Sequence, residues 1–349
     1  MGQALAREMT LRLDGKLQSF DTLYFGGGTP SLLPIGDLQK LLEVANQHRA
    51  GDVWAECTLE ANPEDITPDR CAAWLALGIN RLSIGVQTFD DALLGWMNRQ
   101  HSGAQAEEAI RVAAAAGFEH LTADLIYGLP GRTGAGWAAD LDQMLALPID
   151  HLSAYILTVE PRTVLGHRVN VGLDKEPDED AVSTAYEKLC EKTAAAGFAH
   201  YEVSNFARAG AEAVHNSRYW AGDAYVGIGP GAHGFDGHRT RWANLANNPQ
   251  YVKAVLAAGS AEELPETRET LTDADRYNEA VMTGLRTARG VDLAALERAF
   301  GLRPDVVEPE AWGAALETGE LVRLEGGRVR VAERSWLVGD SVAARFFEV

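Results

Sequence analysis

The sequence predicts an α/β fold in which parallel strands alternate with helices. Three observations indicate this. Short apolar and β-branched runs recur roughly every 30 residues, and stretches with one apolar face lie between them. Polar residues fall at the ends of several runs. Strands joined in this way by right-handed crossovers form either a TIM-like barrel or an open doubly wound sheet.

The expected elements follow in order along the chain. Strands are predicted at 23–26, 54–61, 81–86, 120–127 and 151–159. Amphipathic helices are predicted between them, as at 36–48, 104–116 and 178–196. Because both candidate folds bind ligands beyond the C-terminal ends of their strands, the polar residues there are candidate site residues.

The first expected strand runs directly into Gly26-Gly27-Gly28-Thr29-Pro30. Glycine tolerates positive φ and lets a small molecule contact the main chain. Pro30 holds Thr29 extended, so the next helix cannot begin early. This pattern predicts a binding loop, and a tight strand-to-helix turn without a ligand is the alternative.

Three polar residues interrupt or end apolar runs. Glu60 and Gln87 each follow a predicted strand run, and Asp124 stands within the run at 121–127. A buried carboxylate is costly unless it is paired, so these side chains need partners. A shared ligand would supply them. A neighbouring helix or a buried water is the alternative for each residue.

Arg99 and His101 follow Gln87 closely. The guanidinium of Arg99 offers a fork of donors to a ligand carboxylate, whereas solvation at the surface is the common fate of an arginine. His101 could order Arg99, face the site, or lie exposed at a helix end.

Composition limits the class of protein. The 349 residues, 46% hydrophobic and 23% charged, suffice for one large α/β domain and a smaller one. A formal charge of −19 argues against a duplex nucleic-acid partner. No run of 18 apolar residues and no secretory signal pattern occur, so we predict a cytoplasmic protein.

The cysteines and the last part of the chain complete the prediction. Cys57, Cys71 and Cys190 are too scattered for a metal motif and are expected as small buried side chains.

Beyond residue 240, helices are expected at 273–288 and 292–300, and a hairpin at 320–331. We place the domain boundary between residues 238 and 239. Acidic residues near the hairpin disfavour DNA binding.

Several multi-residue motifs occur in one order along nearly the whole chain. They lie at 26–30, 58–63, 83–89, 99–101, 124–131, 201–207, 215–220 and 227–234. In order and spacing they resemble the radical S-adenosylmethionine (SAM) proteins related to oxygen-independent coproporphyrinogen III oxidase. The resemblance implies a partial (β/α)6 TIM-like barrel with a small, mostly helical, winged-helix-like C-terminal domain.

The same resemblance implies a set of SAM ligands: Gly27, Gly28, Thr29, Glu60, Gln87, Arg99 and Asp124. The glycine loop would meet the methionyl ammonium. Arg99 and Glu60 would serve the methionyl end, and Gln87 and Asp124 the ribose. Which of Glu60 and Gln87 contacts which group stays open. Leu125, Ile126 and Tyr127 would line the wall near the adenosine.

The sequence departs from the family in one respect. Members of the family carry a Cys-x-x-x-Cys-x-x-Cys segment after the first barrel strand, whose thiolates hold a 4Fe-4S cluster. This sequence has none, and Met1 begins in what resembles the following helix. We therefore expect the first strand and the cluster loop to be missing through truncation or a late start codon, with a cluster-less variant as the alternative. Radical catalysis is not expected of this chain.

Residues 215–220 read His-Asn-Ser-Arg-Tyr-Trp. This resembles the His-Asn-x-x-Tyr-Trp signature of the heme chaperone branch of the family, known as HemW. The resemblance implies that His215 binds heme, that heme passes to heme-dependent respiratory proteins, and that the chain can form a homodimer. Imidazole is a common metal ligand, and aromatic rings pack on the macrocycle. The alternatives are a structural His215 with Tyr219 and Trp220 in the core, or an oxygen-independent coproporphyrinogen III oxidase of porphyrin biosynthesis.

Overall fold

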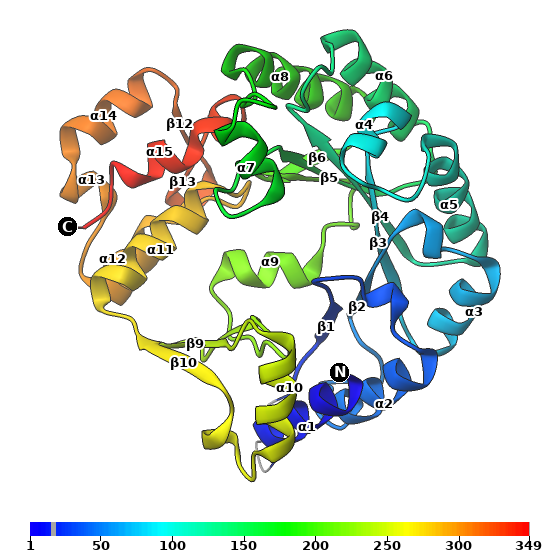
Figure 1. Ribbon diagram of the computed structural model, residues 1–349. Helices are drawn as coiled ribbons and strands as arrows, with labels where there is room; N and C mark the ends of the chain where they lie inside the picture. The colour runs from blue at the N-terminus through cyan, green and yellow to red at the C-terminus, as the bar shows by residue number, and fades with distance from the viewer. Residues whose placement is uncertain (15–18, 349) are drawn as a thin grey trace. The chain divides into compact units, whose positions relative to one another are not determined.

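The computed structural model describes residues 1–14 and 19–348 (Figure 1). Its largest feature is a seven-stranded sheet with strand order β1-β2-β3-β4-β5-β7-β6. Four central strands run parallel: β2 (Glu56–Ala61), β3 (Arg81–Gln87), β4 (His120–Tyr127) and β5 (His151–Ile156). The edges are β1 (Thr22–Phe25) and the pair β6 (Ala199–Glu202) and β7 (Asn205–Ala207), which adds to β5 antiparallel. The predicted α/β class and the five predicted strands are confirmed.

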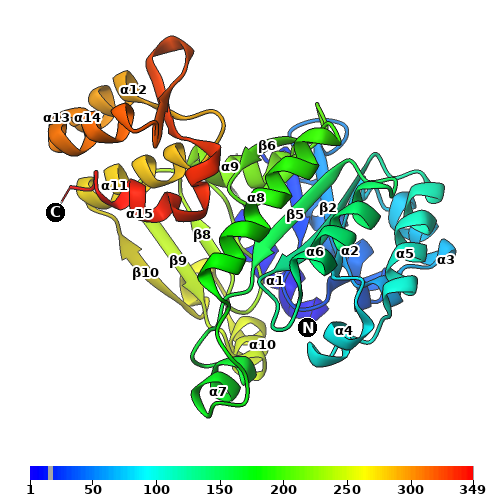
Figure 2. The same ribbon diagram turned by 90° about the horizontal axis from the view of Figure 1, so that it is seen from above.

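Helices follow the strands in the way that parallel pairing requires. In chain order they are η1 (Pro30–Leu32), α2 (Ile35–Asn46), η2 (Pro63–Asp65), α3 (Pro68–Ala76), α4 (Asp91–Trp96), α5 (Gly103–Ala116), α6 (Gly134–Leu145), α7 (Val164–Asn170) and α8 (Glu179–Ala195). Ser102 and Gln105 form a capping box that fixes the start of α5. Figures 1 and 2 show α3, α5, α6 and α8 on the outer side of the curled strands.

The two faces of the sheet differ because side chains alternate along each strand. On β3, the buried residues Leu82, Ile84 and Val86 share one face, and α5 packs against this strand. Ser83 and Gly85 project to the other face. The outer face is thus an apolar core under the helices, and the inner face is free to carry polar residues.

The chain forms two compact units that interleave in sequence. One comprises Met1–Tyr24, Leu32–Cys57 and Ala213–Val349, and the other comprises Phe25–Ser31 and Thr58–Glu212. The boundary between residues 238 and 239 stays a prediction.

Within the first unit, α1 (Gly2–Leu13) packs against α2 and α10 (Asn248–Ala257). The same unit contains α9 (Val214–Ala221), η3 (Ala261–Glu263) and an antiparallel sheet of β8 (His233–Phe235), β9 (Thr240–Asn244) and β10 (Glu266–Thr270). A buried polar network joins these parts, because Glu8 on α1 accepts hydrogen bonds from Arg12, Asn244 and Tyr251.

The C-terminal part is mostly helical. It contains α11 (Asp273–Leu285), α12 (Leu293–Phe300), α13 (Pro304–Val307), α14 (Pro309–Glu317), η5 (Glu333–Val338) and α15 (Gly339–Ala344). A small antiparallel sheet accompanies them, formed by β11 (Val291–Asp292), β12 (Leu321–Arg323) and β13 (Arg328–Val331). The predicted hairpin is confirmed, with η4 (Glu325–Gly327) at its turn and positive φ at Gly326 and Gly327. No helix among the described residues is long and apolar enough to cross a membrane.

Candidate functional site

The glycine loop leads from β1 to η1. Gly27 and Gly28 have φ values of 76° and 68°, a left-handed backbone that favours glycine. A Cβ on either would meet nothing within 4 Å, so the loop is open on that side. The amide of Gly27 donates to Oε2 of Glu60 at 3.0 Å. The loop and the first predicted carboxylate are therefore brought together, as a shared ligand site requires.

Asp124 lies on the inner face of β4. Its carboxylate oxygens are each 3.4 Å from Oγ of Ser83, and Ser153 stands opposite it on β5. Removal from water raises the pKa of the Asp124 carboxyl to about 7. A hydrogen bond from Ser153 opposes this rise in pKa, and the charge of Glu60 adds to it. Asp124 is thus close enough to Glu60 for the two carboxylates to share one site.

Arg99 reaches the end of β3 from the turn after α4. Its Nη2 donates to Oδ1 of Asn62 at 2.9 Å and to the carbonyl of Gly85 at 2.7 Å. Its Nε is buried and lacks a hydrogen-bond partner among residues 1–14 and 19–348. A half-buried guanidinium with a spare donor suits an anionic ligand group.

Gly85 makes room for two of the predicted ligands. A Cβ at this position would lie 2.9 Å from Nε2 of Gln87 and 3.1 Å from Nη2 of Arg99. Gln87 itself has a φ of 72°, an unusual value for a residue with a side chain. The ends of the Gln87 and Arg99 side chains therefore meet beside Gly85, which has no side chain that would obstruct them.

The structure thus brings together five predicted residues: Glu60 and Gln87 at the ends of β2 and β3, Asp124 within β4, and Gly27 and Arg99 on adjoining loops. Gly28 and Thr29 belong to the same loop. A zwitterion needs both a carboxylate and a cation, and a ribose diol needs acceptors. The donor set and the unpartnered Nε of Arg99 therefore fit SAM.

Only one of the three residues predicted to line the adenosine wall lies on the side of β4 that carries Asp124. Ile126 shares the inner face with Asp124. Leu125 and Tyr127 project to the outer face, because side chains alternate along β4. Tyr127 packs there on Trp137 with ring centroids 5.9 Å apart. The prediction for Leu125 and Tyr127 is therefore wrong.

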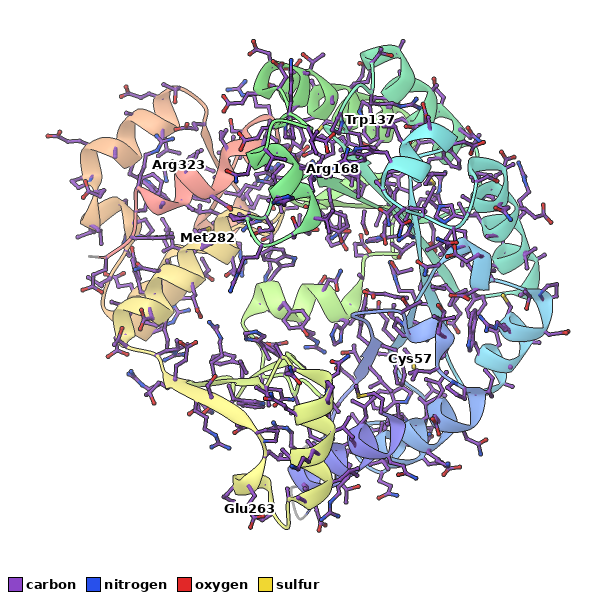
Figure 3. All side chains as sticks on the ribbon, in the orientation of Figure 1. Cys57, Trp137, Arg168, Glu263, Met282 and Arg323 are labelled. Atoms are coloured by element: carbon purple, nitrogen blue, oxygen red, sulfur yellow. The ribbon has the colours of Figure 1, made fainter. Side chains whose placement is uncertain are left out.

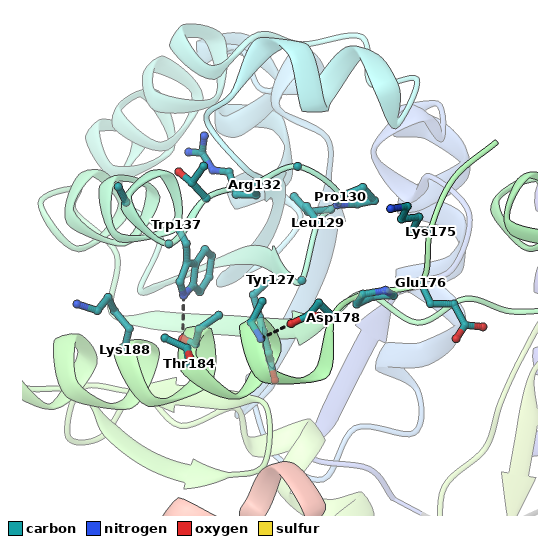
Figure 4. A pocket seen from close by; sticks show the side chains of 18 of the residues that line it. Tyr127, Leu129, Pro130, Arg132, Trp137, Lys175, Glu176, Asp178, Thr184 and Lys188 are labelled. Carbon is teal, nitrogen blue, oxygen red and sulfur yellow. Dashed lines mark hydrogen bonds between the residues drawn. The ribbon is translucent and has the colours of Figure 1, made fainter. Parts of the chain in front are cut away.

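Tyr127 and Trp137 line a cavity of about 840 Å³ formed by the loop after β4 and the first turns of α6 and α8 (Figure 4). Lys175 and Lys188 stand at its opposite ends. The predicted SAM residues do not line this cavity.

Some residues of the inner face escaped prediction. Asn62, Ser83, Gly85 and Ser153 all contact predicted ligands. The alternation of β3 could have found two of them, because Ser83, Gly85 and Gln87 occupy every second position. Small polar residues occur in many strands, so this pattern alone singles out no site.

The cysteines do not fit an iron–sulfur cluster. Cys57, labelled in Figure 3, and Cys71 are fully buried, and burial raises their thiol pKa values to about 12 and about 11. Cys190 is half-buried, contrary to prediction, because it lies at the edge of the buried stripe of α8, which consists of Val182, Tyr186, Leu189 and Thr193. Its Sγ is 3.9 Å from Nδ1 of His200. Within residues 1–14 and 19–348, no group of three or more His, Cys, Asp and Glu residues could hold a metal ion.

His215 lies in the first turn of α9. Its Nδ1 is 2.9 Å from Oγ1 of Thr22, and its Nε2 is 3.3 Å from the hydroxyl of Tyr219. The ring stacks on Tyr24 at 5.2 Å. Burial lowers the pKa of His215 below its ordinary value, which favours the neutral imidazole. The helix start is fixed by Glu56, whose carboxylate accepts from the backbone amide of His215.

Further aromatic side chains follow His215 along α9 and just beyond it. Tyr219 is 44% exposed and packs edge-on against Tyr225 at 4.6 Å. The guanidinium of Arg286 lies over the half-buried ring of Trp220 at 5.1 Å. The exposure of Tyr219 rules out the reading in which Tyr219 fills the core.

Comparison with known proteins agrees with these features. Residues 6–144 match the Radical SAM superfamily, and residues 271–338 match the HemN C-terminal domain. The heme chaperone HemW of Mycobacterium tuberculosis (strain CDC 1551 / Oshkosh) is 38% identical over 321 residues, which cover 92% of this chain and 79% of that protein. HemW of Bacillus subtilis (strain 168) is 33% identical over 346 residues, which cover 98% and 90%.

The fold matches that of coproporphyrinogen III oxidase (HemN) from Escherichia coli, with a TM-score of 0.82 at 22% identity over 99% of this chain and 82% of that one. At this identity the match shows a shared fold. The resemblance stated from the motifs is confirmed. The chain belongs to the HemW family of the radical SAM superfamily.

Proposed function

We propose that this chain is a heme chaperone that binds heme through His215 and delivers it to heme-dependent respiratory proteins. The observation that carries the proposal is the setting of the imidazole. Its Nδ1 lies 2.9 Å from Oγ1 of Thr22, and burial lowers its pKa, which favours the neutral ring. When Nδ1 carries the proton and donates to Thr22, Nε2 presents a lone pair to iron. A fixed partner on the far nitrogen is the usual support of a metal-binding histidine.

The surroundings of His215 suit the rest of the macrocycle. Tyr24 backs the ring on one side, and the exposed Tyr219 and Val214 offer apolar surface on α9. Aromatic side chains with a polar tip pack well on a flat apolar ligand whose edge is wet. The relatives that this chain resembles are named heme chaperones, which supports the same function.

The proposal includes a SAM site on the inner face of the sheet. Arg99 donates to the methionyl carboxylate, Asp124 accepts from the ribose, and Glu60 and Gln87 serve the remaining ammonium and hydroxyl groups. The open glycine loop gives the ligand ammonium access to backbone carbonyl oxygens. The described residues do not fit the cluster, so these roles concern binding alone.

Three further parts of the proposal rest on the sequence. The protein acts in the cytoplasm, consistent with its three scattered cysteines. It forms a homodimer. Its radical SAM part with the heme motif spans residues 1–238, and its C-terminal domain spans residues 239–349.

A heme titration followed by absorbance tests the proposal. His215→Ala should weaken heme binding by more than about tenfold, or about 1.4 kcal/mol. His233→Ala is the matched control, because His233 is an exposed histidine of the same compact unit. An unchanged Soret band and affinity in His215→Ala would reassign His215 to structure.

A second candidate is oxygen-independent coproporphyrinogen III oxidase activity in porphyrin biosynthesis. The converging residues Glu60, Arg99 and Asp124 favour it, because a SAM-dependent oxidase needs the same binding set. Absence of heme binding, together with oxidation of coproporphyrinogen III by a protein that is extended upstream to include the cluster segment and is then reconstituted with the cluster, would select this candidate.

A further inference from the structure

The cavity beside Trp137 takes no part in the proposed SAM site. The loop after β4, the start of α6 and the first turns of α8 form it, and its volume is about 840 Å³ (Figure 4). All of its lining residues fall within 127–188, and none of the predicted SAM ligands is among them. Small-molecule sites commonly enclose about 300 to 1,000 Å³. The cavity therefore has the size of a further ligand site.

The floor of this cavity is apolar. Tyr127, Leu129 and Trp137 line it, and all three are buried. The polar atom of the indole, Nε1 of Trp137, donates to the carbonyl of Ala185 at 2.9 Å and offers no spare donor. Contact with such a floor favours a ligand with an apolar body, because that body leaves water when it binds.

The wall formed by the start of α6 is low. Gly131 and Gly134 both line the cavity, and a Cβ at either position would meet nothing within 4 Å. Gly131 has a φ of 75°, a backbone that favours glycine. Gly134 has no positive φ, and it begins α6 although glycine is a weak helix former. Neither backbone conformation nor packing requires glycine at position 134, whereas the missing side chain keeps the cavity wide.

Two lysines supply unpaired positive charge. Lys175 and Lys188 line the cavity and stand at its opposite ends (Figure 4). Within residues 1–14 and 19–348, neither ammonium group has a hydrogen-bond or ion-pair partner. The third cation of the lining, Arg132, is bound to Asp90 and Asp140 at 2.7 Å each. The lysines are thus the cations available to a ligand.

The acidic residues of the lining are directed elsewhere. Asp174 is paired with Arg168. Asp178 caps α8, where it accepts from a backbone amide at 2.9 Å. Figure 4 shows the carboxylate of Glu176 pointing out of the cavity. The charges that remain to meet a ligand inside the cavity are therefore the two ammonium groups.

We propose that this cavity binds an elongated organic diacid. The apolar body of the ligand lies on Tyr127, Leu129 and Trp137, and its two carboxylates accept from Lys175 and Lys188. Hydrogen bonds between an ammonium and a carboxylate are stronger than neutral ones. A monoacid can engage one lysine at a time, so the two separated ammonium groups favour a diacid. The inference does not depend on the proposed heme and SAM sites.

Calorimetry on the full chain tests the proposal. The probes are octanedioate, dodecanedioate and hexadecanedioate, each beside the monoacid with the same number of carbon atoms. We expect at least one diacid to bind more tightly than its monoacid. Lys175→Gln and Lys188→Gln should each weaken binding of that diacid about two- to fivefold, the range for partly exposed ion pairs. In the double variant the diacid should bind no better than the monoacid.

Lys192→Gln is the matched control for charge. Lys192 lies on α8 as Lys188 does, but it is bound to Asp142 and does not line the cavity. The control should bind the diacid as the wild type does. The inference is overturned if no diacid binds more tightly than its monoacid, or if diacid affinity is unchanged in both single lysine variants. An equal loss of affinity in Lys192→Gln would also overturn it, because the effect would then belong to surface charge in general.

Ala181→Phe tests the position of the site. Ala181 is exposed in the first turn of α8 and lines the cavity, so a phenyl ring there occupies the cavity without entering the core. Diacid affinity should fall more than about tenfold, which corresponds to about 1.4 kcal/mol, with little change in melting temperature. Ala139→Phe, at an exposed position of α6 outside the lining, should bind normally. Normal affinity in Ala181→Phe would place the diacid elsewhere and overturn the inference.

Discussion

The backbone amide of Gly27 donates to the carboxylate of Glu60 at 3.0 Å. The bond joins the loop after β1 to the end of β2 and fixes one carboxylate oxygen. The loop is held at its far end as well, because Ser31 donates to buried Asp65 at 2.7 Å. A left-handed backbone held at both ends is preorganised, so a ligand does not have to order it on binding.

Gly27→Ala should weaken binding of S-adenosylhomocysteine. The φ of 76° would cost an alanine about 1 to 2 kcal/mol in the left-handed region. A Cβ would meet nothing within 4 Å, so steric overlap adds nothing. Calorimetry should show a loss of about five- to thirtyfold. Gly36→Ala, a helical glycine that also has open space around it, is the control and should bind normally.

Gly85→Ala should disrupt binding while leaving the fold intact. Its Cβ would lie 2.9 Å from Nε2 of Gln87 and 3.1 Å from Nη2 of Arg99, the far ends of two flexible side chains. These ends can shift, so the melting temperature should change little, whereas affinity should fall about tenfold or more because two ligand groups are displaced. Gly95→Ala in α4, which meets nothing within 4 Å, is the control. Normal affinity in Gly85→Ala would remove Gln87 and Arg99 from the site.

Ionisation of Asp124 should lower the free energy of unfolding as the pH rises. Its folded pKa of about 7 lies above the ordinary value of 3.8, so the folded state binds more protons between these values. The stabilisation is complete below the unfolded pKa and is lost as the pH rises through the folded pKa. The loss should be about 2 to 4 kcal/mol.

Urea unfolding of wild type and Asp124→Asn at several pH values measures this contribution. Asparagine cannot ionise, so the difference in the free energy of unfolding between the two proteins should change along the pH series. Parallel curves would show that Asp124 ionises freely in the folded protein.

The polar residues of the site differ in how readily they can be recognised from the sequence alone. Glu60 and Asp124 are carboxylates within apolar runs, so their need for a partner can be seen without a structure. Asn62 and Ser83 carry no such signal, because small polar residues on a strand are ordinary. The burial of His101 depends on η2 and β3 packing around it. Residues far apart in sequence make that environment, so a histidine in a turn could not be assigned in advance.

Two predictions about single side chains, those for Tyr127 and Cys190, are wrong. The resemblance implies that Tyr127 lines the adenosine wall, but Tyr127 lies three positions after Asp124 on β4, and strand residues an odd number of positions apart face opposite sides of the sheet. Cys190 was placed in the interior because cysteines are usually buried, whereas its position on α8 leaves it half-buried. The fold class is easier to predict from the sequence, because it follows from the order of apolar runs along the chain. It does not depend on the contacts of any one residue.

Two contacts of His215 should affect heme binding in opposite directions. Thr22 holds Nδ1 at 2.9 Å, so Thr22→Val removes the partner that orients the ring and keeps its size. Loss of such a partner typically weakens a metal site about 10- to 100-fold. Tyr219 lies on Nε2 at 3.3 Å, the atom proposed to bind iron. Tyr219→Phe keeps the ring but frees Nε2, so heme should bind several-fold faster.

Absorbance titration and stopped-flow measurement of the Soret band separate the two effects. Tyr225→Phe is the control, because Tyr225 packs against Tyr219 without contacting His215. The proposed arrangement requires that Thr22→Val bind more weakly, Tyr219→Phe faster and Tyr225→Phe normally. If Tyr219→Phe instead lost heme as His215→Ala does, the hydroxyl itself would be a ligand. The lone pair of His215 would then be directed to the protein and not to iron.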